Sequence, residues 1–164
     1  AIKHRLTSKK PVIHEQVLFA VNYLAQRTDP CIRKKVTNSL IEVSREVNVP
    51  PILIACIIKE ESSFNPLSKN DYGAVGLMQV VPRFHQKRID GYGWEENELF
   101  FIKNNILLGA QILKKYIEQK DGNIIEALQK YVGASVRDKA DKYIENIINN
   151  YILLNVMLAE EVIQ

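Results

Sequence analysis

Cysteine, histidine and long apolar runs are all scarce in this chain of 164 residues, and each scarcity excludes a class of protein. Two cysteines, Cys31 and Cys56, are too few for a disulfide-stapled scaffold or a cysteine-rich zinc site. The three histidines stand far apart, without the spacing of a metal-binding helix. The longest uninterrupted apolar run, from Ile52 to Ile58, is far shorter than the roughly 20 residues of a membrane-spanning helix. We therefore expect a soluble chain without a metal site.

A large excess of one charge sign is missing as well. Lys and Arg total 22 and Asp and Glu total 19, so the net charge of +3 is too small to indicate nucleic acid as a partner. The basic surplus falls in residues 1–50, and the first ten residues hold Lys3, Arg5, Lys9 and Lys10 without any acid. We interpret this opening as a solvated tail, with the stub beside a removed membrane anchor as the alternative.

Apolar residues recur at helical spacing over most of the chain. The clearest case runs from Ile32 to Val47, where apolar residues are separated by three or four positions. The apolar run that begins at Ile52 suits a buried strand as well as a buried helix, but the helical patterns on both sides favour a helix. The sequence predicts a mostly α fold, with helices over 12–27, 32–47, 52–61, 99–119, 124–131 and 139–161.

Turn-forming residues replace this pattern between Ser62 and Gly93. Asn-Pro and Asn-Asp pairs, four glycines and a further proline are spread along the segment. We therefore expect about 30 residues of irregular loop, and loops of that length in a small domain are often functional.

Glu61 lies where the apolar helix meets this loop region. At 100° per residue, its side chain points to the same side as Ile57 and Ile58, whereas Glu60 is turned away. Burial against that apolar side would raise the Glu61 pKa from roughly 4.3 towards the value of about 6–7 that suits a general acid. An exposed pair of carboxylates at a helix end is the alternative.

The residues that follow Glu61 resemble a known family. Glu61-Ser62 is followed by Asn65-Pro66 and then by Gly73-Ala74-Val75-Gly76-Leu77-Met78-Gln79. This order is similar to the lytic transglycosylase domain of bacterial peptidoglycan-cleaving enzymes, which are relatives of goose-type lysozyme. Further matches, from a resemblance that covers about 47–143, are Leu99-Phe100, Asn105-Ile106, Gly109, Leu113, Ala127, Tyr131-Val132-Gly133 and Tyr143.

Two positions depart from the family pattern. The family usually has Asn after the Tyr that stands here as Tyr131, but this chain has Val132-Gly133. Phe101-Ile102 stands where Asp-Pro is common. The resemblance implies a lysozyme-like helical domain with a long active-site loop region. We divide the chain into 1–46, a basic arm with two packing helices, and 47–164, the catalytic domain, which together form one compact unit.

The resemblance also implies a reaction, cleavage of the β-1,4 bond between N-acetylmuramic acid and N-acetylglucosamine. Glu61 would first protonate the leaving oxygen and then deprotonate the C6 hydroxyl, which leaves a 1,6-anhydromuramic acid end without a cofactor or metal. Ordinary glycosidases use two carboxyl groups, so a goose-lysozyme-like hydrolase with Asp71 as the second carboxylate is one alternative. An inactive glycan-binding module of an envelope-spanning machine is the other.

The family motif implies five substrate-binding residues. Ser62 and Gln79 would hydrogen-bond the sugar or orient Glu61, while Tyr131 would place its hydroxyl near Glu61 or the acetamido group. Gly76 would let the backbone approach the glycan, and Met78 would line the cleft. The alternatives are capping for Ser62, solvation for Gln79, turn formation for Gly76 and core packing for Met78 and Tyr131.

The expected partner follows from the substrate, because the sequence shows no targeting signal. The expected substrate, peptidoglycan glycan strands, places the protein in the periplasm or cell envelope. Small members of the family often accompany secretion or conjugation machines or phage particles. We expect Trp94 to pack in the core rather than stack on sugar. A Cys31–Cys56 bridge would require export, and the spacing does not support it.

Overall fold

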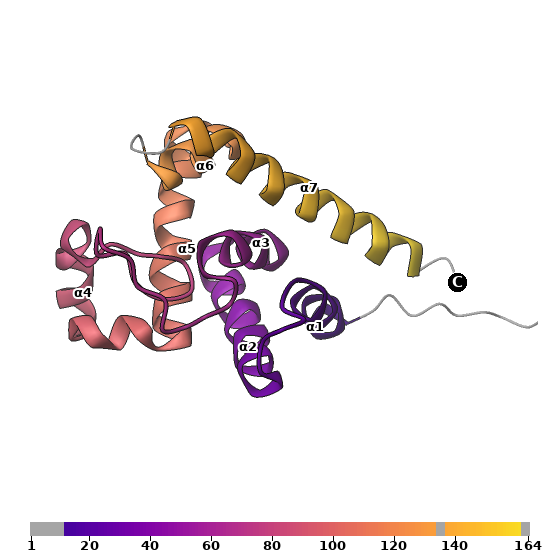
Figure 1. Ribbon diagram of the computed structural model, residues 1–164, viewed down its shortest axis with the longest axis horizontal. Coiled ribbons are helices and arrows are strands. Elements are labelled where there is room, and N and C mark those ends of the chain that lie inside the picture. The colour runs from indigo at the N-terminus through magenta and orange to yellow at the C-terminus, as the bar shows by residue number, and fades with distance from the viewer. Residues whose placement is uncertain (1–11, 134–136, 162–164) are drawn as a thin grey trace, which may run out of the picture.

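The computed structural model describes residues 12–133 and 137–161 (Figure 1). The expected mostly α fold is confirmed, since β-structure in the described residues consists only of two isolated bridges at Val75. None of the described helices combines the length and hydrophobicity needed to cross a membrane. The α-helices are α1 (Ile13–Leu24), α2 (Pro30–Val47), α3 (Pro51–Ser62), α4 (Gln86–Tyr92), α5 (Ile102–Gln119), α6 (Ile124–Val132) and α7 (Arg137–Glu161), and the 3-10 helices are η1 (Pro82–Phe84) and η2 (Glu96–Phe100).

Helix α3 is the buried centre of the fold. Every residue from Ile52 to Ile58 is buried, which explains why the run is apolar on all sides. Pro51 occupies its first position, where a missing N–H costs nothing, and the chain leaves it through Ser63 in the left-handed conformation. Because α1, α2 and α7 all pack against α3, the last turn that carries Glu61 is held in place.

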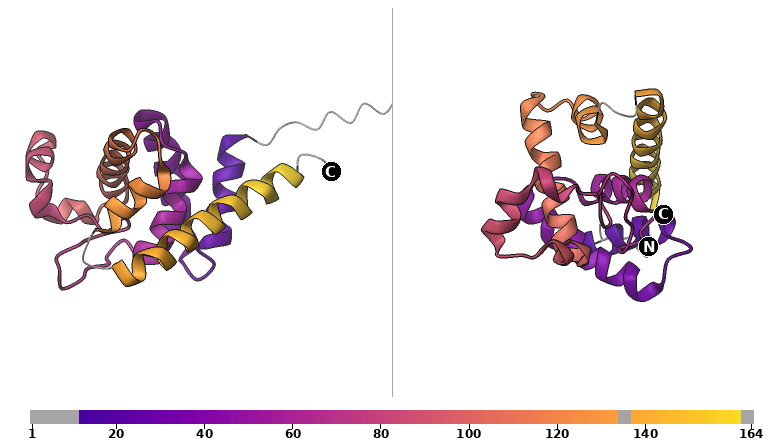
Figure 2. Two further views of the ribbon diagram at one scale, coloured as in Figure 1. Left: turned by 90° about the horizontal axis from the view of Figure 1, so that it is seen from above. Right: turned by 60° about the vertical axis from the view of Figure 1, so that its left-hand side comes forward.

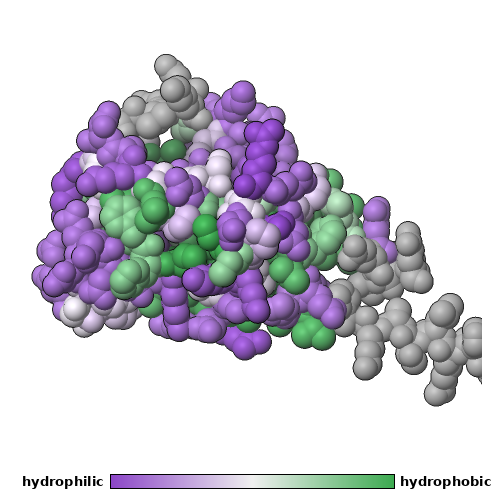
Figure 3. All heavy atoms as spheres, turned by 60° about the horizontal axis from the view of Figure 1, so that its bottom comes forward, coloured by the Kyte–Doolittle hydropathy of each residue, from purple (hydrophilic) through white to green (hydrophobic). Residues whose placement is uncertain are grey.

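The remaining helices form a frame around α3. Helix α5 packs along α2 and α6, and α7 packs against α3. In the right-hand view of Figure 2, α5 and α7 stand on opposite sides and α6 lies at one end of both. The outer face in Figure 3 is mostly hydrophilic, with apolar groups gathered towards its middle.

Helices α1 and α2 contribute to the same core as the rest of the chain. Val17, Val21, Val36 and Leu40 are fully buried in it. The division at residues 46 and 47 stays a prediction. Of the other expectations, core packing of Trp94 is confirmed, because its ring stacks on Tyr92 and packs against the core.

The structure corrects the expectation that residues 62–93 are irregular throughout. The second part of that segment forms η1 and α4. Ile89 is fully buried and anchors α4, and Gly93 in the left-handed conformation ends it. Gly91, read from the sequence as a break, lies inside the helix. The final helix also begins at Arg137, two residues before its expected start.

Candidate active site

A cleft of about 620 Å³ opens beside Glu61 and is lined by α3, the loop before η1, α5 and α6. A second recess, of about 690 Å³, lies between α2, α4 and α5 and is lined by lysines, an arginine and two glutamates of the outer surface. Only the first contains sequence-predicted site residues. Its lining consists of Glu61, Asn70, Tyr72, Ala74, Gln79, Val80, Val81, Phe84, His85, Ile112, Tyr116, Lys130, Tyr131, Val132 and Gly133.

Glu61 has the electrostatic character expected of a general acid. Burial raises its pKa from the ordinary 4.5 to about 7, the neighbouring charge of Glu60 adds to the rise, and a hydrogen bond from Tyr143 opposes it. The expectation that the apolar side of α3 would raise this pKa is confirmed. Glu60 instead accepts a hydrogen bond from Asn146 on α7 at 3.0 Å. Two adjacent carboxylates therefore have different partners and different environments.

Tyr143, which matches the family pattern but was not predicted as a site residue from the sequence, contacts Glu61 directly. Its hydroxyl donates to Oε1 of Glu61 at 2.5 Å, across 82 residues of chain. Burial and the Glu61 charge hold the Tyr143 pKa well above 10, so the hydroxyl stays a neutral donor. The available signal was its place on the same stripe of α7 as buried Ile147 and Leu154, because a buried tyrosine hydroxyl needs a polar partner.

Tyr131 lines the cleft from α6 and fixes the loop opposite. Its hydroxyl donates to the backbone carbonyl of Met78 at 2.9 Å, and its ring meets the ring of Tyr116 edge-on. Burial, then the charge of Glu61, raise its pKa well above 10. The hydroxyl expected to reach Glu61 or the acetamido group is thus bonded to backbone, although the ring lies close to Glu61.

Gln79 also lines the cleft, and its side chain ties the loop together. Its Nε2 donates to the carbonyls of Gly76 at 2.9 Å and Ser68 at 3.3 Å. Its backbone has a φ of 49°, in the left-handed region. These contacts hold the side chain at the cleft wall without any substrate.

The other three predicted binding residues, Ser62, Gly76 and Met78, are not among the described residues that line the cleft. The Ser62 hydroxyl donates back to the carbonyl of Ile58. Met78 is fully buried against Gly109, where an added Cβ would lie 2.5 Å from its sulfur. Gly76 packs against Asn105, whose side-chain amide an added Cβ would overlap. Ser62 is thus bonded to helix backbone, Met78 belongs to the core, and Gly76 lies against a buried amide.

Asn105 is the buried polar residue that organises this wall. Its Nδ2 donates to the carbonyls of Val75 and Leu99, and its Oδ1 accepts from the backbone N–H of Met78. Three backbone groups of the loop and η2 are thereby satisfied by one side chain of α5. The loop conformation therefore depends on α5.

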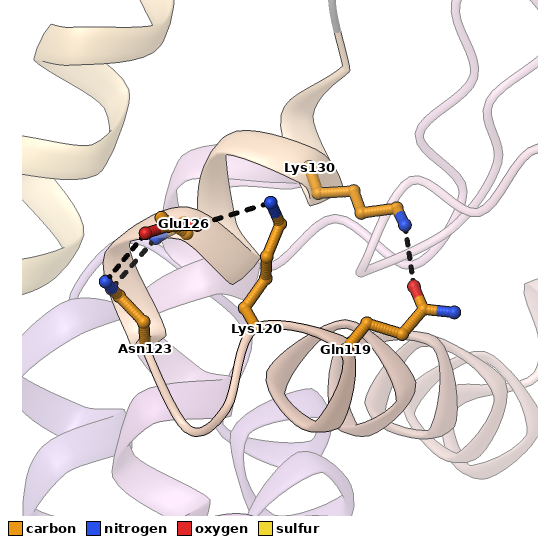
Figure 4. A network of polar contacts seen from close by, with 5 residues as sticks. All are labelled: Gln119, Lys120, Asn123, Glu126 and Lys130. Atoms are coloured by element: carbon orange, nitrogen blue, oxygen red, sulfur yellow. Dashed lines mark hydrogen bonds and ion pairs between the residues drawn. The ribbon is translucent and has the colours of Figure 1, made fainter.

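Polar contacts between α5 and α6 hold the opposite wall (Figure 4). Asn123 caps α6 through the backbone N–H of Glu126, and Lys120 pairs with the carboxylate of Glu126 at 3.2 Å. Lys130 donates to Gln119 at 2.6 Å and lies over the ring of Tyr116. The network positions Lys130 and its neighbour Tyr131 on the cleft.

Among the described residues that line the cleft, Glu61 is the only carboxylate. Asp71, the second carboxylate considered from the sequence, is not part of the lining, although Asn70 and Tyr72 on either side of it are. A two-carboxylate glycosidase needs both groups at the scissile bond. The geometry therefore favours chemistry carried by one carboxyl group.

Comparison with known proteins agrees with this geometry. The family model of the transglycosylase SLT domain matches residues 38–149. The membrane-bound lytic murein transglycosylase C of Histophilus somni is 31% identical over 147 residues, which cover 88% of this chain and 33% of the relative. A transglycosylase of Enterobacteria phage PRD1 is 29% identical over 92 residues, covering 56% of this chain and 32% of the relative. The chain spans about a third of the length of these curated relatives, and it belongs to the transglycosylase SLT domain family.

Proposed function

We propose that this chain cleaves the β-1,4 bond between N-acetylmuramic acid and N-acetylglucosamine in peptidoglycan and leaves a 1,6-anhydromuramic acid end. The observation that carries the proposal is Glu61, the one carboxyl group among the described residues of the cleft lining, with a pKa of about 7 and a tyrosine donor. A group with that pKa exists in both protonation states near neutral pH, as an acid that must later act as a base requires.

The reaction uses Glu61 twice. Protonated Glu61 gives its proton to the glycosidic oxygen as the C1–O bond breaks, and the substrate's own acetamido group supports the positive charge at C1. The resulting carboxylate takes the proton of the C6 hydroxyl, whose oxygen bonds to C1. Glu61 ends protonated, and no water is consumed.

Tyr143 supports the step between these two proton transfers. Its hydroxyl, held neutral by a raised pKa, donates to the carboxylate that exists after the first transfer. Hydrogen bonds to a charged group are stronger than those to a neutral one. Tyr143 is thus a positioning residue. Its hydroxyl stabilises the ionised form of Glu61, whereas burial stabilises the protonated form.

We further infer that the chain acts in the cell envelope, since its substrate is found there. One relative is named as membrane-bound, and another is a phage transglycosylase. Ser62, Gly76 and Met78 contribute to binding through backbone position and packing in this proposal, while Gln79 and Tyr131 present their surfaces to the glycan.

Mass spectrometry of digested peptidoglycan tests the reaction. We expect muropeptides with anhydro ends, lighter by one water than hydrolysed ends, and none from the Glu61→Gln variant. Reducing ends would assign the chain to the hydrolases instead. Absence of any product from the native chain would contradict the proposal and favour a binding module.

A further inference from the structure

Two aromatic rings at the cleft are exposed to solvent. Tyr72 is 57% exposed and Phe84 is 61% exposed, and both line the cleft that contains Glu61. They come from different segments, the loop before the bridge residue Val75 and the end of η1. Single exposed apolar side chains are common on protein surfaces, so what distinguishes these two rings is that both line the same cleft.

The two rings, the aromatic pair from here on, are held by Arg83. Its guanidinium carbon lies 4.2 Å from the ring centroid of Tyr72 and 4.7 Å from that of Phe84. Its Nη1 also donates to the carbonyl oxygen of Tyr72 at 2.6 Å. The ring centroids are 6.3 Å apart with their planes at 46°. One side chain therefore fixes both rings through cation–π contacts and a backbone hydrogen bond.

The backbone that carries Tyr72 is fixed as well. Asn70 accepts the N–H of Ala74 on its side-chain oxygen at 3.0 Å and the N–H of Gly73 on its carbonyl at 3.0 Å. Gly73 has a φ of 91° and faces Arg83, to which an added Cβ would come within 3.3 Å. Because rings and backbone are already ordered, the protein loses little conformational freedom when a ligand binds to them.

The surroundings of the aromatic pair indicate a neutral, polar ligand with an apolar face. Both rings line the cleft while Arg83 does not, and more than half of each ring residue's surface stays exposed beside the Arg83 contacts. Of the other lining residues, Asn70 and Gln79 are uncharged amides. Burial lowers the pKa of His85, and Lys130 carries its charge from α6. A pyranose ring offers C–H groups on one face and hydroxyl or acetamido groups at its edge, which suits an aromatic surface beside amides.

We propose that Tyr72 and Phe84, positioned by Arg83, form an additional saccharide-binding subsite at the entrance of the cleft. The proposal rests on the proposed function, because it assigns the subsite to the same glycan strand that Glu61 cleaves. A strand long enough to reach the aromatic pair gains contacts that a single disaccharide at Glu61 does not make. The subsite therefore determines how strongly long strands are preferred over short ones.

Glycan binding by the Glu61→Gln variant tests the subsite without turnover. The probes are peptidoglycan glycan strands stripped of their stem peptides, as one disaccharide and as strands of several disaccharides, titrated by calorimetry. In this background we expect Tyr72→Ala and Phe84→Ala each to weaken binding of long strands roughly fivefold to tenfold. Binding of the disaccharide should stay the same, and Tyr72→Phe, which keeps the ring, should bind long strands as before.

Phe101→Ala is the matched control, since Phe101 is 59% exposed but lies outside the cleft lining. Its variant should bind both probes as Glu61→Gln alone does. If Tyr72→Ala and Phe84→Ala also bind long strands like this control, the subsite is overturned and the proposed function stands. If Glu61→Gln binds no glycan of either length, both proposals are overturned together.

Kinetics separate the positioning role of Arg83 from general damage. With Glu61 intact, Arg83→Met should raise KM for long strands several-fold and leave kcat within about twofold, because the lost interaction is equal in ground and transition states. The melting temperature checks that the fold persists. A loss confined to kcat, or an equal loss on short and long strands, would overturn this role.

Discussion

At the residue scale, the hydroxyl of Tyr143 opposes the rise in the Glu61 pKa that burial causes. Replacing Tyr143 by Phe removes the donor and should raise the Glu61 pKa above about 7. Since a hydrogen bond to a charged group contributes roughly 1.5–3 kcal/mol, we expect kcat to fall by about tenfold or more at neutral pH. The pH–rate profile should move to higher pH.

The control for this substitution is Tyr151→Phe, on the same helix but outside the cleft lining. Its profile should match that of the native chain. An unchanged profile for Tyr143→Phe would show that the hydroxyl does not act on Glu61.

The raised pKa of Glu61 also has a cost in stability. The folded chain holds this proton up to a pKa of about 7, whereas the unfolded chain releases it near 4.5, so stability falls as pH rises between these values. Glu61→Gln should therefore unfold at higher denaturant concentration than the native chain at pH 8, by roughly 1–3 kcal/mol in unfolding free energy. At pH 4 the difference should disappear. A gain of equal size at both pH values would point to packing instead of charge.

At the scale of the elements, Gly76 in the loop and Gly91 in α4 differ in the space around them and in their backbone conformation. An added Cβ at Gly76 would overlap Asn105 and the backbone of Leu99, and its φ of +75° disfavours any side chain. Gly91 lies in α4 with nothing within 4 Å of an added Cβ. Gly76→Ala should thus lower the unfolding free energy by at least about 2 kcal/mol, which would be measured as a clearly lower melting temperature.

Gly91→Ala is the matched substitution and should stabilise the chain by about 0.5–1 kcal/mol, because alanine favours a helix over glycine. Thermal unfolding of the two variants side by side measures both effects. Similar melting temperatures would show that the Asn105 contact does not constrain the loop.

The elements also show why sequence reasoning succeeded at some places and failed at others. The orientation of Glu61 follows from helical periodicity, which is a local property, and so it was predictable. Tyr143 and Arg83 act through contacts between segments. Helical periodicity places Tyr143 on the buried side of α7, but no local pattern identifies Glu61 or Tyr72 as the partner. Helix α4 was missed because its glycine reads as a break, whereas the burial of Ile89 supplies the stabilisation that local propensity lacks.

At the scale of the whole molecule, one core joins the first helices to the site. Residues of α1 and α2 are buried together with those of α3 and α5. We therefore expect a single unfolding transition that coincides by circular dichroism and by the fluorescence of Trp94, the sole tryptophan. Two separated transitions would indicate that the division near residue 46 marks independent folding units.

The pairing of α3 with α7 has a consequence for the order in which the protein becomes active during synthesis. Glu61 and the cleft residues through Gly133 leave the ribosome before Tyr143 does, and domains fold as their segments emerge. A nascent chain that ends before α7 has its acid but lacks the helix that buries and orients that acid. If the proposed function holds, competence for glycan cleavage is therefore acquired only after synthesis has passed residue 143, because the acid and the hydroxyl that orients it come from helices that lie far apart in the chain.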